Sequence, residues 1–145
     1  MAEQIPDQQG RLIAIVVPNP AAGVDFLYNL PLRTRWAVRS VEATLTTVLG
    51  GANRVPELVF TIGAAPVLRI TASQDLAAAG VFIFGWHEGA TAQIVATQTS
   101  RVASIPPRYL LNDQGSIQVQ TVALALGDTW TDIHIVVEEW IEPLV

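Results

Sequence analysis

The chain alternates short apolar stretches with turn residues along almost its whole length. The first apolar stretch is Arg11 to Val17, and Pro18-Asn19-Pro20 ends it because proline removes a backbone donor and favours extended turns. A shorter apolar piece at 24–30 ends at Pro31. Both stretches are predicted to form strands, the second one short.

Period-two alternation identifies the next strands. Apolar residues at 41, 43 and 45 alternate with polar residues at 42, 44 and 46, inside a Val- and Thr-rich segment at 34–48. Residues 49–54 supply turn residues, and alternation resumes at 58–62, which predicts a hairpin. Residues 67–71 follow another turn. Residues 81–86 are apolar on both faces, so this strand is either covered on both sides or has one face in a subunit contact.

The C-terminal third continues the same pattern. Alternation returns at 116–122, and from Asp132 onward residues 133, 135 and 137 form an apolar row while 134, 136 and 138 lie on the other face. Trp140 and Ile141 would place apolar groups on both faces. About eight strands with turns every 8–12 residues and no substantial helix predict an all-β fold, an antiparallel, jelly-roll-like β-sandwich.

Length and composition set the domain organisation. A chain of 145 residues fits one domain, and folding at that size removes roughly two-thirds of the unfolded chain's surface from water. The polar residues 1–10 are expected to be a flexible arm that can reach a neighbour, and residues 11–145 a single sandwich domain. Cysteine is absent, so the fold needs no disulfide.

Charge and hydrophobicity exclude several partners. Half of the residues are hydrophobic and 14% are charged, which favours some apolar surface in a contact between subunits. All eight basic residues are Arg, which genome base composition or interface pairing could each explain. The net charge of −5 disfavours nucleic acid. The uncharged stretch 76–86 is too short to cross a bilayer as a helix, so a soluble protein without a membrane partner is expected.

Catalytic and metal-binding patterns are missing. The two histidines, His87 and His134, accompany no G-x-S-x-G elbow and no H-x-H metal motif. The pair Asp132 and His134 could share a face, which is more typical of a solvated strand than of a metal site. Glu138 and Glu139 are adjacent and point to opposite faces of a strand, so they cannot act as a paired acid and base. We therefore expect no enzyme, no cofactor and no metal.

Tryptophan and arginine suggest where contacts form. The four tryptophans at 36, 86, 130 and 140 either fill the core or a subunit contact, or form a sugar-stacking platform. Trp36 lies among three arginines, a grouping that suits an interface. The predicted interface residues are Ile5, Arg33, Arg35, Trp36, Arg39, Trp140 and Ile141.

Several features of the chain fit one class of protein. They are the Pro-containing arm, Trp-Ala-Val-Arg-Ser-Val-Glu-Ala-Thr-Leu-Thr-Thr at 36–47, Ile105-Pro106-Pro107 before a strand, and Leu126-Gly127-Asp128-x-Trp130 leading into Val136-Val137-Glu138-Glu139-Trp140-Ile141. From about residue 34 onward this pattern resembles small structural proteins of tailed bacteriophages, which include capsid decoration or cement proteins and tail components.

The resemblance implies a virion protein made in the host cytoplasm, and it does not choose between capsid and tail; a location on the capsid surface is expected from the leading hypothesis. The leading hypothesis is a homotrimeric decoration protein that binds the major capsid protein and stabilises the shell by bridging its subunits. The alternative is a glycan-binding β-sandwich module, tail-associated or free, that uses exposed tryptophans.

Overall fold

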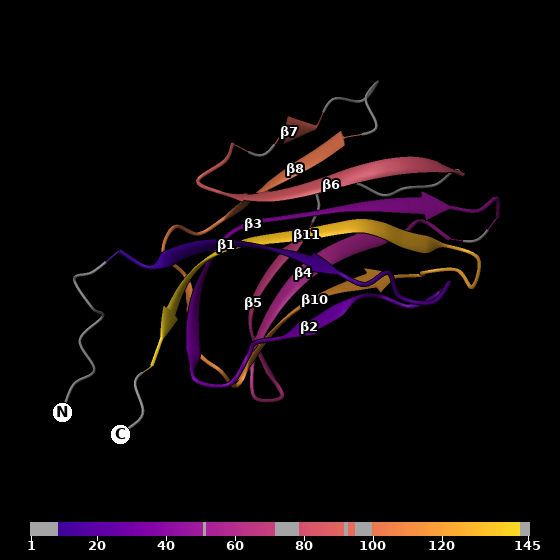
Figure 1. Cartoon of the computed structure of the whole chain (residues 1–145). Helices are drawn as coiled ribbons and strands as arrows, with labels where there is room; N and C mark the ends of the chain where they lie inside the picture. The colour runs from indigo at the N-terminus through magenta and orange to yellow at the C-terminus, as the bar shows by residue number, and fades with distance from the viewer. Residues whose placement is uncertain (1–8, 51, 72–78, 92, 95–99, 143–145) are drawn as a thin grey trace.

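Two stacked β-sheets form the molecule. The computed structural model describes residues 9–50, 52–71, 79–91, 93–94 and 100–142, and these residues contain eleven strands and no helix (Figure 1). The larger sheet consists of β1 (Arg11–Val17), β3 (Thr34–Thr47), β6 (Gly80–Glu88), β7 (Gln93–Ile94), β8 (Ser100–Ile105), β9 (Leu110–Leu111) and β11 (Thr129–Ile141). The smaller sheet consists of β2 (Leu27–Asn29), β4 (Val55–Ile62), β5 (Ala65–Thr71) and β10 (Gly115–Val122).

Eight of these strands form a jelly roll, so the predicted fold class is confirmed. The order β1-β11-β3-β6 in one sheet faces β2-β10-β4-β5 in the other, and all neighbours in these two rows are antiparallel. The chain changes sheet between most consecutive strands and remains in one sheet for the β4–β5 hairpin. The three other strands occupy the connection between β6 and β10. There β8 runs parallel to β6, and β9 pairs with β3 beyond the end of β6.

The predicted hairpin between 34–48 and 58–62 is wrong. β3 and β4 belong to different sheets, so the connection at 48–54 crosses from one layer to the other. In a sandwich, two successive half-buried strands can bury their apolar faces against each other across the core as well as side by side, and alternation looks the same in both cases. Residues 65–71 do form the hairpin partner of β4.

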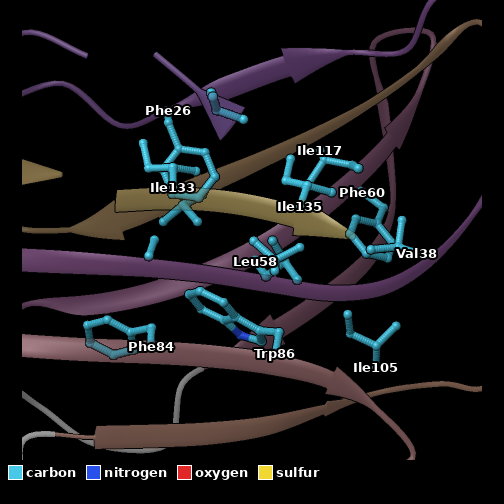
Figure 2. Packing of buried hydrophobic residues seen from close by; sticks show 14 of the residues in the cluster. Phe26, Val38, Leu58, Phe60, Phe84, Trp86, Ile105, Ile117, Ile133 and Ile135 are labelled. Atoms are coloured by element: carbon cyan, nitrogen blue, oxygen red, sulfur yellow. The ribbon is translucent and has the colours of Figure 1, made fainter. Parts of the chain in front are cut away.

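One core lies between the sheets. Ile133, Ile135 and Val137 of β11 are fully buried, as the alternation of that segment predicted. Figure 2 shows Leu58, Phe60 and Ile117 of the smaller sheet on one side of this core, with Phe84 and Trp86 of β6 on the other. On β6 the outward side chains Val81 and Ile83 are exposed. That strand is therefore not covered on both faces.

Candidate functional site

Three loops meet at one end of the sandwich, at the right in Figure 1. They are residues 18–26 between β1 and β2, residues 48–54 between β3 and β4, and residues 123–128 between β10 and β11. We call their described residues the loop tip. The backbone N–H of Gly23 donates to the carbonyl oxygen of Asp128 at 2.7 Å, which joins the first loop to the third.

A fully buried ion pair holds the loop tip together. The carboxylate of Asp128 accepts hydrogen bonds from Arg54 Nε at 2.8 Å and from Arg54 Nη2 at 3.1 Å, and neither side chain is exposed. It also accepts from the backbone N–H groups of Val48 and Ala125. Arg54 donates in addition to the carbonyl oxygens of Val48, Gly50 and Ala52. A buried ion pair is tolerated when its remaining donors and acceptors are satisfied in this way.

Burial and hydrogen bonding act in opposite directions on Asp128. Burial raises the pKa of its carboxyl group, but the hydrogen bonds from Arg54 and from two backbone N–H groups outweigh burial and leave the pKa below its ordinary value. The carboxylate therefore stays charged wherever the protein is folded near neutral pH. This charge fixes the shape of two loops at once.

Asp25 attaches the remaining loop to the sandwich. Its carboxylate accepts from the backbone N–H and the hydroxyl of Thr121, at 2.7 and 2.6 Å, and from the indole N–H of Trp130 at 2.9 Å. With Arg54 and Asp128, this residue completes the set of charged side chains in the three loops. All three are thus engaged inside the protein.

Apolar side chains project from this fixed base into solvent. Leu49 is 85% exposed and Leu126 is 90% exposed, and Val24 and Val48 are exposed beside them. A Cβ atom added to Gly127 would lie 2.9 Å from a methyl group of Val48, which shows how closely the loops approach. The loop tip is therefore a pre-formed apolar surface without exposed charged side chains.

The predicted arginines lie elsewhere and bind acidic residues of their own chain. Arg35 Nε contacts Glu142 Oε1 at 2.6 Å, and Arg33 donates to the backbone carbonyl of Glu142. Arg39 lies between Glu88 and Glu138 and forms an ion pair with each. The hydrogen bonds that Arg39 donates to the carboxylates of Glu88 and Glu138 raise the pKa of its guanidinium group. The arginines therefore join strands of this chain, and a contact with a partner remains a prediction for them.

Trp36 is not on the surface, which corrects its place among the interface residues. Its side chain is fully buried, stacks on Tyr28 with ring centroids 5.6 Å apart, and donates from its indole nitrogen to Glu139 at 2.9 Å. Trp86 and Trp130 are fully buried as well. Core packing is thus the role of three of the four tryptophans, and a sugar platform built from them has no exposed ring. The cause is the alternation of β3, β6 and β11, which points these residues inward.

The remaining predicted interface residues divide into two groups. Ile141 is exposed and Trp140 is partly exposed at the end of β11, so both stay available for a contact. Ile5 lies outside the described residues.

The two histidines both lie on the outer face of the larger sheet, where His87 Nε2 is 3.4 Å from Glu42 and His134 is the register partner of Glu42. The described residues contain no group of three acidic or histidine side chains arranged to hold a metal.

Glu138 and Glu139 point to opposite faces, as their adjacency predicted. Glu138 binds Arg39 and the backbone N–H of Gly10, whereas Glu139 binds Arg11 and the indole of Trp36. Sequence reasoning missed the pair of Arg54 and Asp128, which are 74 positions apart. Each occupies a Gly-containing turn, and nothing in the local pattern connects one turn to the other.

Comparison with known proteins adds no relative. No protein-family model, no curated protein and no solved structure matches the chain. Among the described residues there is also no helix of the length and hydrophobicity that a membrane span requires.

Proposed function

We propose that the chain is a capsid decoration protein of a tailed bacteriophage, which binds the outer shell through its loop tip and bridges major-capsid subunits. The observation that carries this proposal is the loop tip itself, where Leu49 and Leu126 are almost fully exposed on loops fixed by a buried ion pair. Loops ordered in advance lose little entropy when they bind, so such a surface suits a binding role. A jelly roll hosts many functions, and the fold alone does not choose among them.

The chemistry of the loop tip favours a protein partner. Binding to nucleic acid or to anionic lipid headgroups depends on exposed Lys and Arg. The loops contain a single basic residue, Arg54, and it is buried against Asp128. The matching surface is therefore an uncharged apolar patch on another protein, which the shell of an assembled capsid can offer many times over.

The small number of exposed leucines favours an assembly with several loop tips, for which we propose a homotrimer. Burying two leucines contributes about 3–6 kcal/mol before the cost of association. A dissociation constant of 1 mM corresponds to about 4 kcal/mol, so one loop tip alone would bind weakly. Three tips on one trimer would add through effective concentration, and a protein that binds only assembled shell stabilises that state by mass action.

Image reconstruction of the assembled particle tests the proposal directly. Density for this jelly roll is expected on the outer shell with its loop tip toward the major capsid protein. Density at the tail and none on the shell would contradict the proposal. A glycan array with the purified chain tests the glycan-binding alternative, because decoration predicts no glycan binding.

Substitutions at the loop tip test the proposed contact. Particles prepared without the protein are mixed with purified variants, and the number of bound copies is measured. Leu49→Asp and Leu126→Asp are each expected to lower this occupancy by tenfold or more, because a charge would be buried in the contact. Leu32→Asp is the matched control, since Leu32 is 83% exposed in the loop between β2 and β3, at the other end of the sandwich. Circular dichroism should be unchanged in all three variants. An equal loss of occupancy for Leu32→Asp would contradict the proposal that the loop tip makes the contact.

Deleting residues 1–8 tests the arm separately. If the arm orders upon a neighbouring subunit, the truncated chain should occupy fewer sites and protect the shell less against heat. Unchanged occupancy and heat resistance would exclude the arm from the contact while leaving the loop tip as its basis.

A further inference from the structure

The edge of the larger sheet at β1 is unlike the other edges of the sandwich. β1 pairs with β11 on one side, and within the described residues no strand pairs with its other side. A strand in this position presents a row of unpaired backbone N–H and C=O groups, which is a template for another strand. Proteins usually protect such edges with prolines, bulges, charges or short strands.

The other three edges carry such protection. β2 has three residues, and the described part of β7 has two. β5 contains Pro66 and the charged Arg69, and its pairing with β4 has a register shift between Phe60 and Thr61. β1 is seven residues long, pairs with β11 without a shift, and has no proline between its ends. Its one charged residue, Arg11, lies at the end of the strand and is paired with Glu139 at 2.8 Å.

Both faces of β1 carry incompletely buried apolar side chains. On the outer face Leu12 is 67% exposed and Val16 is 71% exposed, with exposed Ala14 between them. On the inner face Ile13 and Ile15 pack against the core and remain partly accessible. A strand added at this edge would therefore cover two apolar rows and satisfy the backbone at the same time.

We infer that the strand added at this edge is β1 of a second copy, in an antiparallel pair centred on Ala14. This register pairs all seven residues of each strand. It places Leu12 opposite Val16 of the second copy and Ile13 opposite Ile15, so that apolar groups meet on both faces. The smallest side chain of the strand lies on the two-fold axis, where the two copies of the same residue must lie side by side.

Charge is compatible with this register. The two Arg11 side chains lie at opposite ends of the paired strands, about 20 Å apart at 3.3 Å per residue. This separation exceeds the Debye length of roughly 8 Å at physiological salt. Each guanidinium also remains next to Glu139 of its own chain. Within β1 itself, no like charges therefore oppose the pairing of two copies.

The inference concerns the purified chain and does not rest on the proposed function. If the chain also forms trimers, a two-fold contact at each β1 edge would connect one trimer to its neighbours. The decoration layer would then be linked laterally as well as attached to the shell.

A single cysteine at the two-fold axis tests the contact. The chain contains no cysteine, so Ala14→Cys introduces one thiol. Opposed residues of an antiparallel pair have Cα atoms 4.5–5.5 Å apart, which lies within the range that a disulfide spans. Under mild oxidation the full-length variant is expected to give a covalent dimer on a non-reducing gel, at least tenfold faster than the control Val122→Cys. One cysteine per chain can join no more than two chains, whatever larger assembly the protein forms.

Paired cysteines test the register. Leu12→Cys mixed with Val16→Cys is expected to crosslink between the two variants, while each alone crosslinks no faster than the control. In sedimentation experiments on protein without introduced cysteines, Val16→Lys should weaken dimerisation at least tenfold and leave the circular dichroism spectrum unchanged. The reason is that an exposed lysine on an edge strand opposes pairing with another strand.

Two results would overturn the inference. The first is an Ala14→Cys chain that forms covalent dimer no faster than the Val122→Cys control. The second is crosslinking that requires deletion of residues 1–8, because the edge of the full-length chain would then be covered by its own arm. Loss of capsid binding would not affect either result, so failure of the proposed function and failure of this contact are distinguishable.

Discussion

Asp128 is the residue on which the shape of the loop tip depends most. It accepts four hydrogen bonds from three partners in two loops, and removing one member of a buried ion pair leaves the other charge without compensation. We predict that Asp128→Asn lowers the free energy of unfolding by about 3–5 kcal/mol, measured by urea denaturation at pH 7. The exposed Asp132 provides the control, because Asp132→Asn should change this free energy by less than about 0.5 kcal/mol.

Acid should reduce the difference in unfolding free energy between the wild-type protein and Asp128→Asn. The pKa of Asp128 is lower in the folded protein than in the unfolded chain, so the unfolded state binds more protons as the pH falls. Its stabilising contribution is complete above the unfolded value of about 3.9 and is lost as the pH falls through the folded value. The gap in unfolding free energy between wild type and Asp128→Asn should therefore be constant from pH 7 to 5 and shrink below pH 4. A gap that stays constant down to pH 2 would contradict this account.

Sequence reasoning at the scale of single residues worked where a neighbour in the chain determines the outcome. Adjacency placed Glu138 and Glu139 on opposite faces, and period two placed Ile133 and Ile135 in the core. It failed for Trp36, because a cluster of nearby arginines indicates a surface while the alternation of β3 turns the indole inward. It could not find the contact between Arg54 and Asp128, which depends on how two loops that each cross between the sheets pack against one another.

At the scale of elements, a glycine in the first loop controls how the loops pack. Gly23 has φ of 74°, and a Cβ there would lie 2.8 Å from the Cα of Leu126. Gly63, in the β4–β5 turn, has φ of 61° and open space around it. Gly63→Ala should cost about 1–2 kcal/mol from the backbone conformation alone. Gly23→Ala should cost about 1–3 kcal/mol more, because the clash involves backbone that must move.

Thermal unfolding of the two glycine variants measures this difference. Gly23→Ala should also lower particle occupancy, since displacing the third loop moves Leu126, whereas Gly63→Ala should retain wild-type occupancy. Equal melting temperatures for the two variants would show that the loops can separate without cost.

Strand positions could be predicted from the sequence, and strand partners could not. Alternation and flanking prolines predicted strands at residues 11–17 and within 34–48, where the structure has β1 (Arg11–Val17) and β3 (Thr34–Thr47). The pairs β1–β11 and β2–β10 join segments far apart in the chain. Several different strand orders would satisfy the hydrogen bonds and bury the same apolar faces, so the sequence pattern does not select one of them. The same ambiguity led to the wrong hairpin between β3 and β4.

At the scale of the whole molecule, the exposed charge is separated from the proposed docking surface. The chain carries a net charge of −5, while the charged residues of the three loops are engaged inside the protein. Attraction between exposed charges weakens with salt, whereas apolar contact does not. Raising sodium chloride from 50 to 500 mM should thus change particle occupancy by less than twofold. A tenfold decrease, measured by co-sedimentation with particles, would indicate that another, charged surface makes the contact.

The central place of β11 also sets the order in which the molecule can fold. β11 lies between β1 and β3, so β1 has no neighbour among the described strands of the larger sheet until residues 129–141 have been synthesised, whereas β3 can pair earlier with β6 and β9. Pairing strands that are more than a hundred positions apart requires closing long loops first, which makes folding slow, on the order of milliseconds to seconds. During translation the apolar row of β1 must therefore remain without its partner until β11 has been made, and β11 is the strand that joins β1 to the rest of the larger sheet.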